Sequence, residues 1–113
     1  MPQDRFYVAQ SDENLVGFVS LKGAEVVKLY VGVGDRGTGV ASALLDFAER
    51  TLRQDRILEA ELLCTAGNAR AERFYLRHGW SLIDTFEDAL WTPTEVSRKF
   101  IVSTRRYRKN LNP

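Results

Sequence analysis

The residues whose types and spacing best suit chemistry lie at positions 36–41, Arg-Gly-Thr-Gly-Val-Ala. They follow a hydrophobic stretch, Glu25 to Val31, and precede an amphipathic one, so their glycines stand at the expected start of a helix. Glycine lets a ligand approach the main chain closely, and the unpaired amide groups of a helix's first turn present positive potential to that ligand. The segment therefore predicts a binding site for a phosphate group.

A second pair of candidates, Asn68 and Tyr75, lies seven positions apart in a segment that Asn68 can cap as a helix and Gly79 can end. At about 100° per residue, seven positions return to the same face of a helix. Both side chains can therefore line one ligand. Simpler roles stay open, because Asn68 also suits a plain cap and Tyr75 a core residue with a hydrogen-bonded hydroxyl.

The sequence contains one cysteine, Cys64, and one histidine, His78. Cys64 lies in a predicted strand, where a free cysteine usually behaves as a small buried hydrophobic residue. His78 ends a predicted helix, where it suits the negative end of the helix dipole better than catalysis. One cysteine and one histidine at unrelated positions do not complete a zinc site, so we expect no metal.

Hydrophobic periodicity predicts the elements that must position these residues. Strands are expected at 5–10, 15–21, 25–31, 57–65, 80–90 and 98–108, and helices at 39–53 and 68–78, with a loop around Trp91 to Thr94. In the first helix the apolar arc contains Val40, Leu44, Leu45, Phe47, Ala48 and Leu52, and leaves Asp46, Glu49, Arg50 and Arg53 outside it. Simple alternation places Glu25, Val27, Leu29 and Val31 on one face of their strand. The first three strands form an antiparallel meander, and the fourth follows a crossover helix and is expected to run parallel to the third.

Length and composition bound the rest. A chain of 113 residues is expected to form one domain, 1–113, with a single core. A formal net charge of +1 implies no nucleic-acid partner, and there is no apolar run long enough to span a membrane. The first five residues do not resemble a signal peptide, so a cytoplasmic location is the default expectation.

Two familiar phosphate loops fit residues 32–37 less well. The segment Gly-Val-Gly-Asp-Arg-Gly matches G-x-G-x-x-G, but a dinucleotide fold needs repeated parallel βαβ units, and here an antiparallel meander comes first. A P-loop requires a lysine after its last glycine, and this chain has Thr38.

A different spacing is more specific. Arg36-x-x-Gly39-x-Ala41 resembles the Arg/Gln-x-x-Gly-x-Gly/Ala motif of the GNAT superfamily of acyl-CoA-dependent N-acetyltransferases. A second segment, Asn68-x-x-Ala71-x-x-Phe74-Tyr75-x-x-x-Gly79-Trp80, resembles the family's later Asn-x-x-Ala-x-x-Phe-Tyr motif and its closing Gly-aromatic pair. The resemblance implies an α/β (α+β) fold, with a mixed sheet whose central parallel strands splay apart, two helices and C-terminal antiparallel strands.

The resemblance also implies a ligand and an activity. The ligand is acetyl-CoA, and the activity is transfer of its acetyl group to a primary amine by direct attack in a ternary complex. Residues implied in cofactor binding are Leu29, Tyr30, Val31, Arg36, Gly37, Thr38, Gly39, Val40, Ala41 and Asn68. The main chain of the loop would hold the pyrophosphate, and the strand residues and Asn68 would hold the pantetheine arm.

Two catalytic roles follow from the same resemblance. Tyr75 would lie near the sulfur and protonate the departing thiolate, which is chemically sound because the reference pKa of a phenol, about 10, is close to that of a thiol. Glu25 stands where some family members that acetylate protein lysines place a glutamate base. A solvated turn glutamate, with water as the base, is the alternative.

The chain departs from the family at its beginning. GNAT domains usually begin with a strand and one or two helices that wall the acceptor side, and this chain starts almost at the hairpin. A short enzyme with an open acceptor site, a homodimer whose partner supplies the wall, and a non-catalytic acyl-CoA-binding or sensing module are the three explanations.

Overall fold

The computed structural model describes residues 4–91 and 99–112, and within them it contains six strands and two α-helices. The strands form one mixed sheet in the order β1-β2-β3-β4-β6-β5. The predicted mixed α+β fold is thereby confirmed. The described chain divides into two compact units, one running up to Glu61 and including the residues from Asn110 onward, the other comprising Leu62–Lys109.

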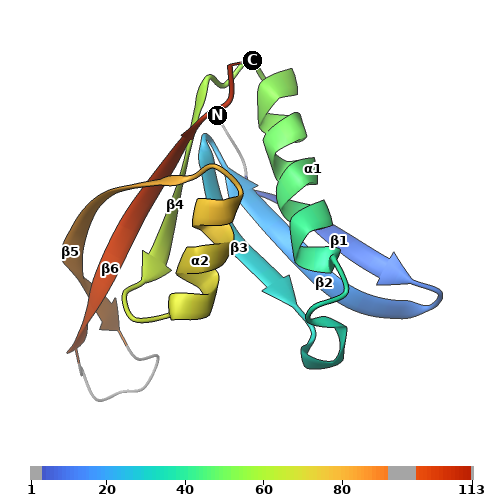
Figure 1. The fold of residues 1–113 in the computed structure, drawn as a ribbon, viewed down its shortest axis with the longest axis horizontal. Coiled ribbons are helices and arrows are strands. Elements are labelled where there is room, and N and C mark those ends of the chain that lie inside the picture. The colour runs from blue at the N-terminus through green and yellow to red at the C-terminus, as the bar shows by residue number, and fades with distance from the viewer. Residues whose placement is uncertain (1–3, 92–98, 113) are drawn as a thin grey trace. The chain divides into compact units, whose positions relative to one another are not determined.

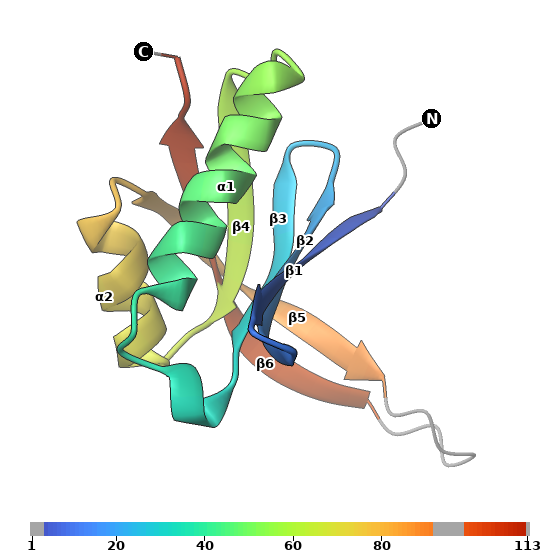
Figure 2. The ribbon, with the colours of Figure 1, turned by 90° about the vertical axis from the view of Figure 1, so that its right-hand side faces the viewer.

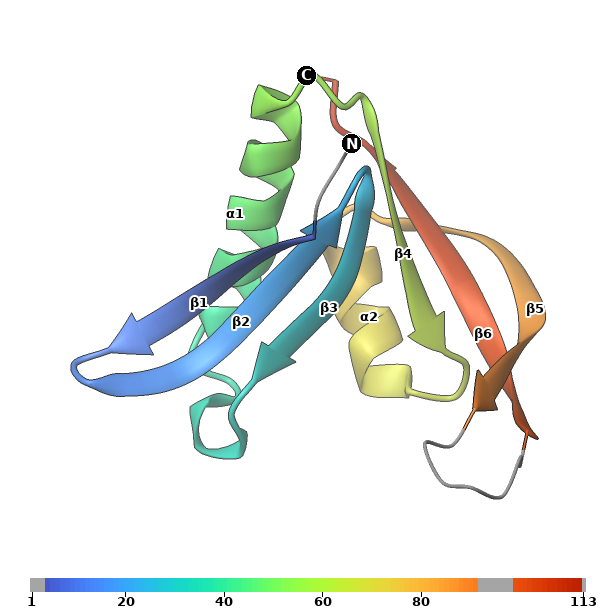
Figure 3. The same ribbon diagram turned by 180° about the vertical axis from the view of Figure 1, so that it is seen from behind.

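The first unit begins with an antiparallel meander of β1 (Arg5–Ser11), β2 (Asn14–Lys22) and β3 (Glu25–Val31), seen from behind in Figure 3. The helix α1 (Val40–Gln54) covers one face of this meander (Figure 1). The side chains of Val19, Leu21, Leu45 and Leu52 are completely buried and form the core of the unit. These bounds lie within one or two residues of the predicted ones.

A glycine in β2 lets the start of α1 approach the sheet. A Cβ atom added to Gly17 would lie 2.5 Å from the carbonyl oxygen of Tyr30 and 3.0 Å from a side-chain carbon of Leu44. Real Cβ atoms do not come so close to other heavy atoms, so any larger residue would push the first turns of α1 or the β2–β3 pair apart. Gly17 therefore helps to set where α1 begins.

A β-bulge in β3 corrects one expectation. Ser20 pairs with Lys28 but Leu21 pairs with Val26, so Val27 is an extra residue on β3. Residues directly opposite each other in a sheet share a face, so Val26 points into the core with Leu21, and the preceding Glu25 points to the other face. The prediction that Glu25 shares a face with Leu29 and Val31 is therefore wrong.

The buried face of α1 also differs from the predicted arc. Glu49, expected outside it, is buried, and its carboxylate lies 3.6 Å from Arg53 at the i,i+4 position. Phe47, expected inside it, is 37% exposed and packs edge-on against Tyr7 with ring centroids 4.9 Å apart. The ion pair with Arg53 compensates for the buried charge of Glu49. A hydrophobicity pattern does not register such a pair, so it places Glu49 outside the buried face.

The second unit contains the end of β4 (Glu59–Thr65), α2 (Ala69–Arg77), and the antiparallel pair β5 (Ser81–Trp91) and β6 (Lys99–Asn110). The amide of Ala66, just after β4, donates to the carbonyl of Ser103 on β6 at 2.8 Å. Leu62, Trp80 and Tyr107 are almost completely buried and form the core of this unit. Trp91, predicted to begin a loop, ends β5 instead, and the rest of that predicted loop lies outside the described residues.

Candidate functional site

The predicted phosphate loop connects β3 to α1, and its path is plain in Figure 2. The amide of Gly32 donates to the carbonyl of Val16 at 2.9 Å, and a single 3₁₀ turn, η1 (Val33–Asp35), follows. The amide of Asp35 donates to the carbonyl of Gly32 at 2.9 Å, and the Thr38 hydroxyl donates to the carbonyl of Asp35. The loop is thus held by hydrogen bonds to its own backbone and to β2, one of them from the Thr38 side chain.

The end of the loop, just before α1, contains two glycines in left-handed backbone conformations. Gly37 and Gly39 adopt left-handed backbone angles, with φ of 79° and 91°, which other residues adopt only with strain. Gly39 caps α1 without any side-chain hydrogen bond, and the first turn of the helix contains no acidic residue. A Cβ atom added at either glycine would meet nothing within 4 Å, so neither glycine is packed against other groups on that side. The start of α1 therefore has the uncrowded glycine backbone that a phosphate site requires.

Two charged residues of the loop, Asp35 and Arg36, differ in their surroundings. The carboxylate of Asp35 is turned back toward Gly32, 3.0 Å from where a Cβ atom would stand there. Arg36 is exposed. The exposed Arg36 thus supplies positive charge next to the glycines that precede α1.

The strand residues before the loop, Leu29 to Val31, point alternately to the two faces of the sheet. Leu29 and Val31 lie opposite Val19 and Gly17 on the face covered by α1. The Tyr30 ring stacks on Phe18 on the other face, with ring centroids 5.4 Å apart, and is 49% exposed. β3 ends at Val31, directly before the predicted phosphate loop.

Glu25 begins the same strand, at the opposite end from the loop. Burial raises the pKa of its carboxyl group above the ordinary value, the neighbouring Glu61 adds to the rise, and Lys22 opposes it. At roughly 3.3 Å per residue, a seven-residue strand separates Glu25 from the loop by roughly 20 Å. A ligand that reaches both groups must be long and extended.

The other predicted site residues belong to the second unit and share α2. The side chain of Asn68 caps this helix, with its oxygen accepting from the amide of Ala71 at 3.3 Å. Tyr75 lies near the other end of the same helix. The cap confirms the simpler role weighed for Asn68 and leaves the residue exposed at the helix start.

Tyr75 is held by other aromatic rings. Its ring centroid lies 6.1 Å from that of Tyr107 and 6.4 Å from that of Trp80, and its carbonyl accepts from the Trp80 amide at 3.0 Å. Burial, with a smaller contribution from Cys64, raises the pKa of the Tyr75 hydroxyl to about 12. The phenol therefore stays protonated throughout the neutral range, as a proton donor must.

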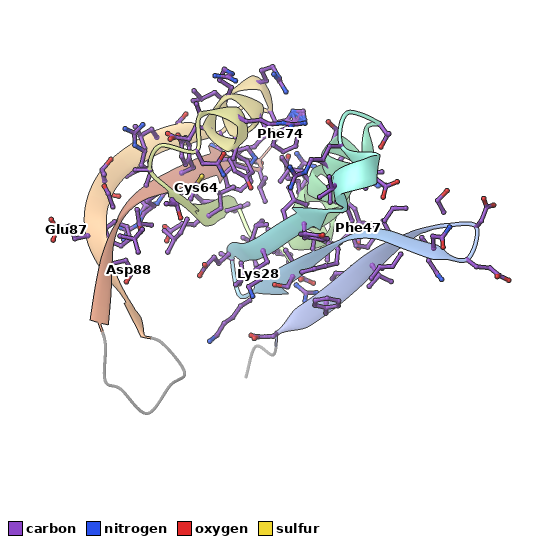
Figure 4. The ribbon with its side chains drawn as sticks, turned by 90° about the horizontal axis from the view of Figure 1, so that it is seen from below. Lys28, Phe47, Cys64, Phe74, Glu87 and Asp88 are labelled. Atoms are coloured by element: carbon purple, nitrogen blue, oxygen red, sulfur yellow. The ribbon has the colours of Figure 1, made fainter. Side chains whose placement is uncertain are left out.

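The remaining reactive side chains suit structural roles. Cys64, labelled in Figure 4, is buried in β4, and burial together with the Glu72 charge raises the pKa of its thiol. His78 is the C-cap of α2, and its ring lies 4.4 Å from that of Phe74. Among residues 4–91 and 99–112 there is no group of three His, Cys, Asp or Glu placed to hold a metal ion. The helices in that same part of the chain are too short or too polar to cross a membrane.

Sequence reasoning missed one residue, Glu72. Its side chain is nine-tenths buried and accepts hydrogen bonds from the Tyr107 hydroxyl at 2.6 Å and from Arg105 at 2.7 Å. The Tyr107 hydrogen bond above all, with help from Arg105, lowers the pKa of Glu72. A signal was present, because Glu72 stands four positions after Asn68 and three before Tyr75, on the face those two residues share.

Gly37 and Gly39 leave open space on their Cβ sides before α1, and Tyr75 on α2 stays protonated at neutral pH, two features that the resemblance to an acetyltransferase requires. The chain belongs to the GNAT acetyltransferase family, because residues 2–82 match the acetyltransferase (GNAT) domain. An uncharacterised N-acetyltransferase of Mycobacterium tuberculosis is 32% identical over 89 residues, which cover 74% of this chain. This chain spans 57% of the length of that curated relative.

Solved structures show the same fold. The PaiA N-acetyltransferase of Thermoplasma acidophilum, determined in complex with coenzyme A, is 25% identical, with a TM-score of 0.74. The comparison covers 95% of this chain and 60% of that one. Nourseothricin acetyltransferase is 26% identical with a TM-score of 0.78, over 96% of this chain and 66% of its own.

Proposed function

We propose that this chain is an N-acetyltransferase that moves an acetyl group from acetyl-CoA to a primary amine within a ternary complex. The single observation that carries the proposal is the backbone at the start of α1, where Gly37 and Gly39 adopt left-handed angles and no side chain caps the helix. Membership of the GNAT family supports the choice of acetyl-CoA over other phosphate ligands. The coenzyme A bound to the PaiA relative supports it further.

The binding residues are assigned as follows. The amides of residues 37–41 hold the pyrophosphate, aided by the helix dipole and by the exposed Arg36. The main chain of Leu29 to Val31 pairs with the amide groups of the pantetheine arm, as one strand pairs with another. Asn68 contacts the same arm. The distance from the loop to Glu25 along β3 suits an extended ligand with its reacting end far from its phosphates.

The chemistry then requires proton transfers at the nitrogen and at the sulfur. The thioester supplies an activated acetyl group, and the amine nitrogen forms a bond to its carbonyl carbon while the carbon–sulfur bond breaks. Tyr75 gives its hydroxyl proton to the departing thiolate, and the second proton that the nitrogen loses as it becomes an amide returns to the Tyr75 oxygen through solvent. The amine loses its proton to Glu25, directly or through water, because an ammonium group has no free electron pair with which to attack.

Thiol release tests the proposal. We expect acetyl-CoA to release free coenzyme A when a suitable member of a panel of polyamines, aminoglycosides and lysine peptides is added, with matching acetylated amine detected by mass spectrometry. Binding of acetyl-CoA without release across the panel would instead support the non-catalytic binding module. Absence of binding would contradict both readings.

A further inference from the structure

Glu72 is the least expected side chain of the second unit. It is a carboxylate on the inner face of α2, with only 8% of the residue exposed. Burying an ionised carboxylate is costly unless it is paired and hydrogen-bonded. The two oxygens of Glu72 together accept three hydrogen bonds, which meet this requirement.

The three donors come from two separate places in the unit. One oxygen accepts from the amide of Gly67 at 3.2 Å, in the turn that leads into Asn68. The other accepts from Arg105 and from the hydroxyl of Tyr107, which alternate on one face of β6. Glu72 therefore ties the turn before α2 to β6.

Each end of this connection touches a residue that the proposed reaction uses. Gly67 is the neighbour of Asn68, so its hydrogen bond fixes the backbone on which the Asn68 side chain stands. Tyr107, held through its hydroxyl, packs against the ring of Tyr75. Tyr107 is almost completely buried, with only 1% of its surface accessible to solvent.

We propose that Glu72 is a positioning residue for acetyl transfer: it holds Asn68 through the Gly67 turn and Tyr75 through the Tyr107 ring. The inference rests on the proposed function, because it assigns the two roles that Glu72 supports. It also goes beyond that function, because position 72 is not specified in either sequence motif. Glu72 would act on Asn68 and Tyr75 through other residues and not by direct contact with the substrate.

The first experiment compares Glu72→Gln with a matched control, Glu87→Gln. Glu87 lies on β5 of the same unit, and its side chain stands out from the ribbon in Figure 4. We expect E72Q to lower kcat about tenfold to a hundredfold, since a small misplacement of a reacting group has costs of that size. KM for acetyl-CoA should change less than threefold, and E87Q should leave both constants unchanged.

The second experiment separates positioning from general destabilisation. If Glu72 acts through Tyr75, then E72Q should lower kcat much less in a Tyr75→Phe background than in the wild type. A merely structural effect would lower kcat by the same factor in both backgrounds. An unchanged kcat in E72Q, or equal factors in the two backgrounds, would overturn the assignment.

A third variant covers failure to fold. If E72Q is unfolded by circular dichroism, the same cycle is run with Tyr107→Phe, which keeps the ring and removes the hydroxyl that donates to Glu72. Failure of the proposed function and failure of the Glu72 assignment give different results. A wild-type protein that releases no thiol overturns the proposed function, and with it any catalytic purpose of Glu72. A turning-over wild type with a normal E72Q overturns the Glu72 assignment alone.

Discussion

At the scale of single residues, the environments of Tyr75 and Glu25 suit opposite proton transfers. Burial raises the pKa of the Tyr75 hydroxyl to about 12, so it remains a proton donor at neutral pH. Burial also raises the pKa of Glu25, which makes its carboxylate a stronger base than an exposed one. Both shifts have the same physical origin, since burial disfavours the charged form of either group.

Tyr75→Phe tests the donor. The substitution removes only the hydroxyl and keeps the ring contacts with Trp80 and Tyr107. We expect kcat to fall about a hundredfold, the lower end of what general acid–base catalysis contributes, with the affinity for acetyl-CoA unchanged. Steady-state kinetics and isothermal calorimetry measure the two quantities. Tyr7→Phe, on β1, is the control, and equal losses in both variants would contradict the role of Tyr75.

The pH profile tests the base. Glu25 must be ionised to accept a proton, so kcat/KM should fall as the pH drops through its pKa, which lies above the ordinary value of 4.5. No alkaline fall due to Tyr75 should occur below about pH 10, because its pKa is about 12. Glu25→Gln should remove the acid limb and lower the plateau. A profile with the same acid limb in E25Q would show that water or another group is the base.

At the scale of elements, the proposed binding and catalytic residues depend on the start of α1 in the first unit and on the attachment of α2 to β6 in the second. The first contains left-handed glycines, and the second includes the buried carboxylate of Glu72. A substitution can remove either feature. Two predictions separate the loss of such a feature from a general loss of stability.

The glycine at the start of α1 has a matched control elsewhere in the same unit. Gly39 and Gly23 both adopt left-handed angles, with φ of 91° and 58°, and both have open space around them. Gly39→Ala and Gly23→Ala should each cost about 1–2 kcal/mol of stability, because the strain is of the same kind. Only G39A should weaken acetyl-CoA binding, as measured by calorimetry. Equal affinities in the two variants would remove the loop from the binding site.

The attachment of α2 should be sensitive to acid. The pKa of Glu72 is lower in the folded chain than its ordinary value of 4.5, so its ionised form stabilises the fold. That stability is fully present above about pH 4.5 and is lost as the pH falls through the lowered pKa. Thermal melts between pH 6 and 3 should therefore show a shallower loss of Tm in Glu72→Gln than in the wild type. Parallel curves for the two proteins would contradict this sign.

At the scale of the whole molecule, the chain belongs to the GNAT family but spans 57% of the curated relative's length. The acceptor, the possible homodimer and the cytoplasmic location stay predictions. The proposed pyrophosphate-binding residues, 37–41, all lie in the first unit, and binding of acetyl-CoA can be measured without knowing the acceptor.

Binding should be visible in the stability of the whole chain. At a concentration of about 100 Kd, a ligand that binds only the folded state adds about 2.7 kcal/mol, which for a chain of this size raises Tm by about 10 °C. We expect this shift with acetyl-CoA in differential scanning fluorimetry. S-acetylpantetheine, which lacks the phosphates, should give little shift at the same concentration. Equal shifts with both compounds would contradict a phosphate-centred site.

The sequence by itself determined what depends on short spacing. The bounds of α1 and α2, the Asn68 cap and the end of α2 at Gly79 all follow from local backbone geometry, which repeats at known intervals. Only the tertiary structure decided what depends on pairing between distant segments. The bulge at Val27 turned Glu25 to the other face of the sheet, because strand register is set by the partner strand. Glu72 found its donors 33 and 35 positions away on β6, a distance that no local pattern encodes.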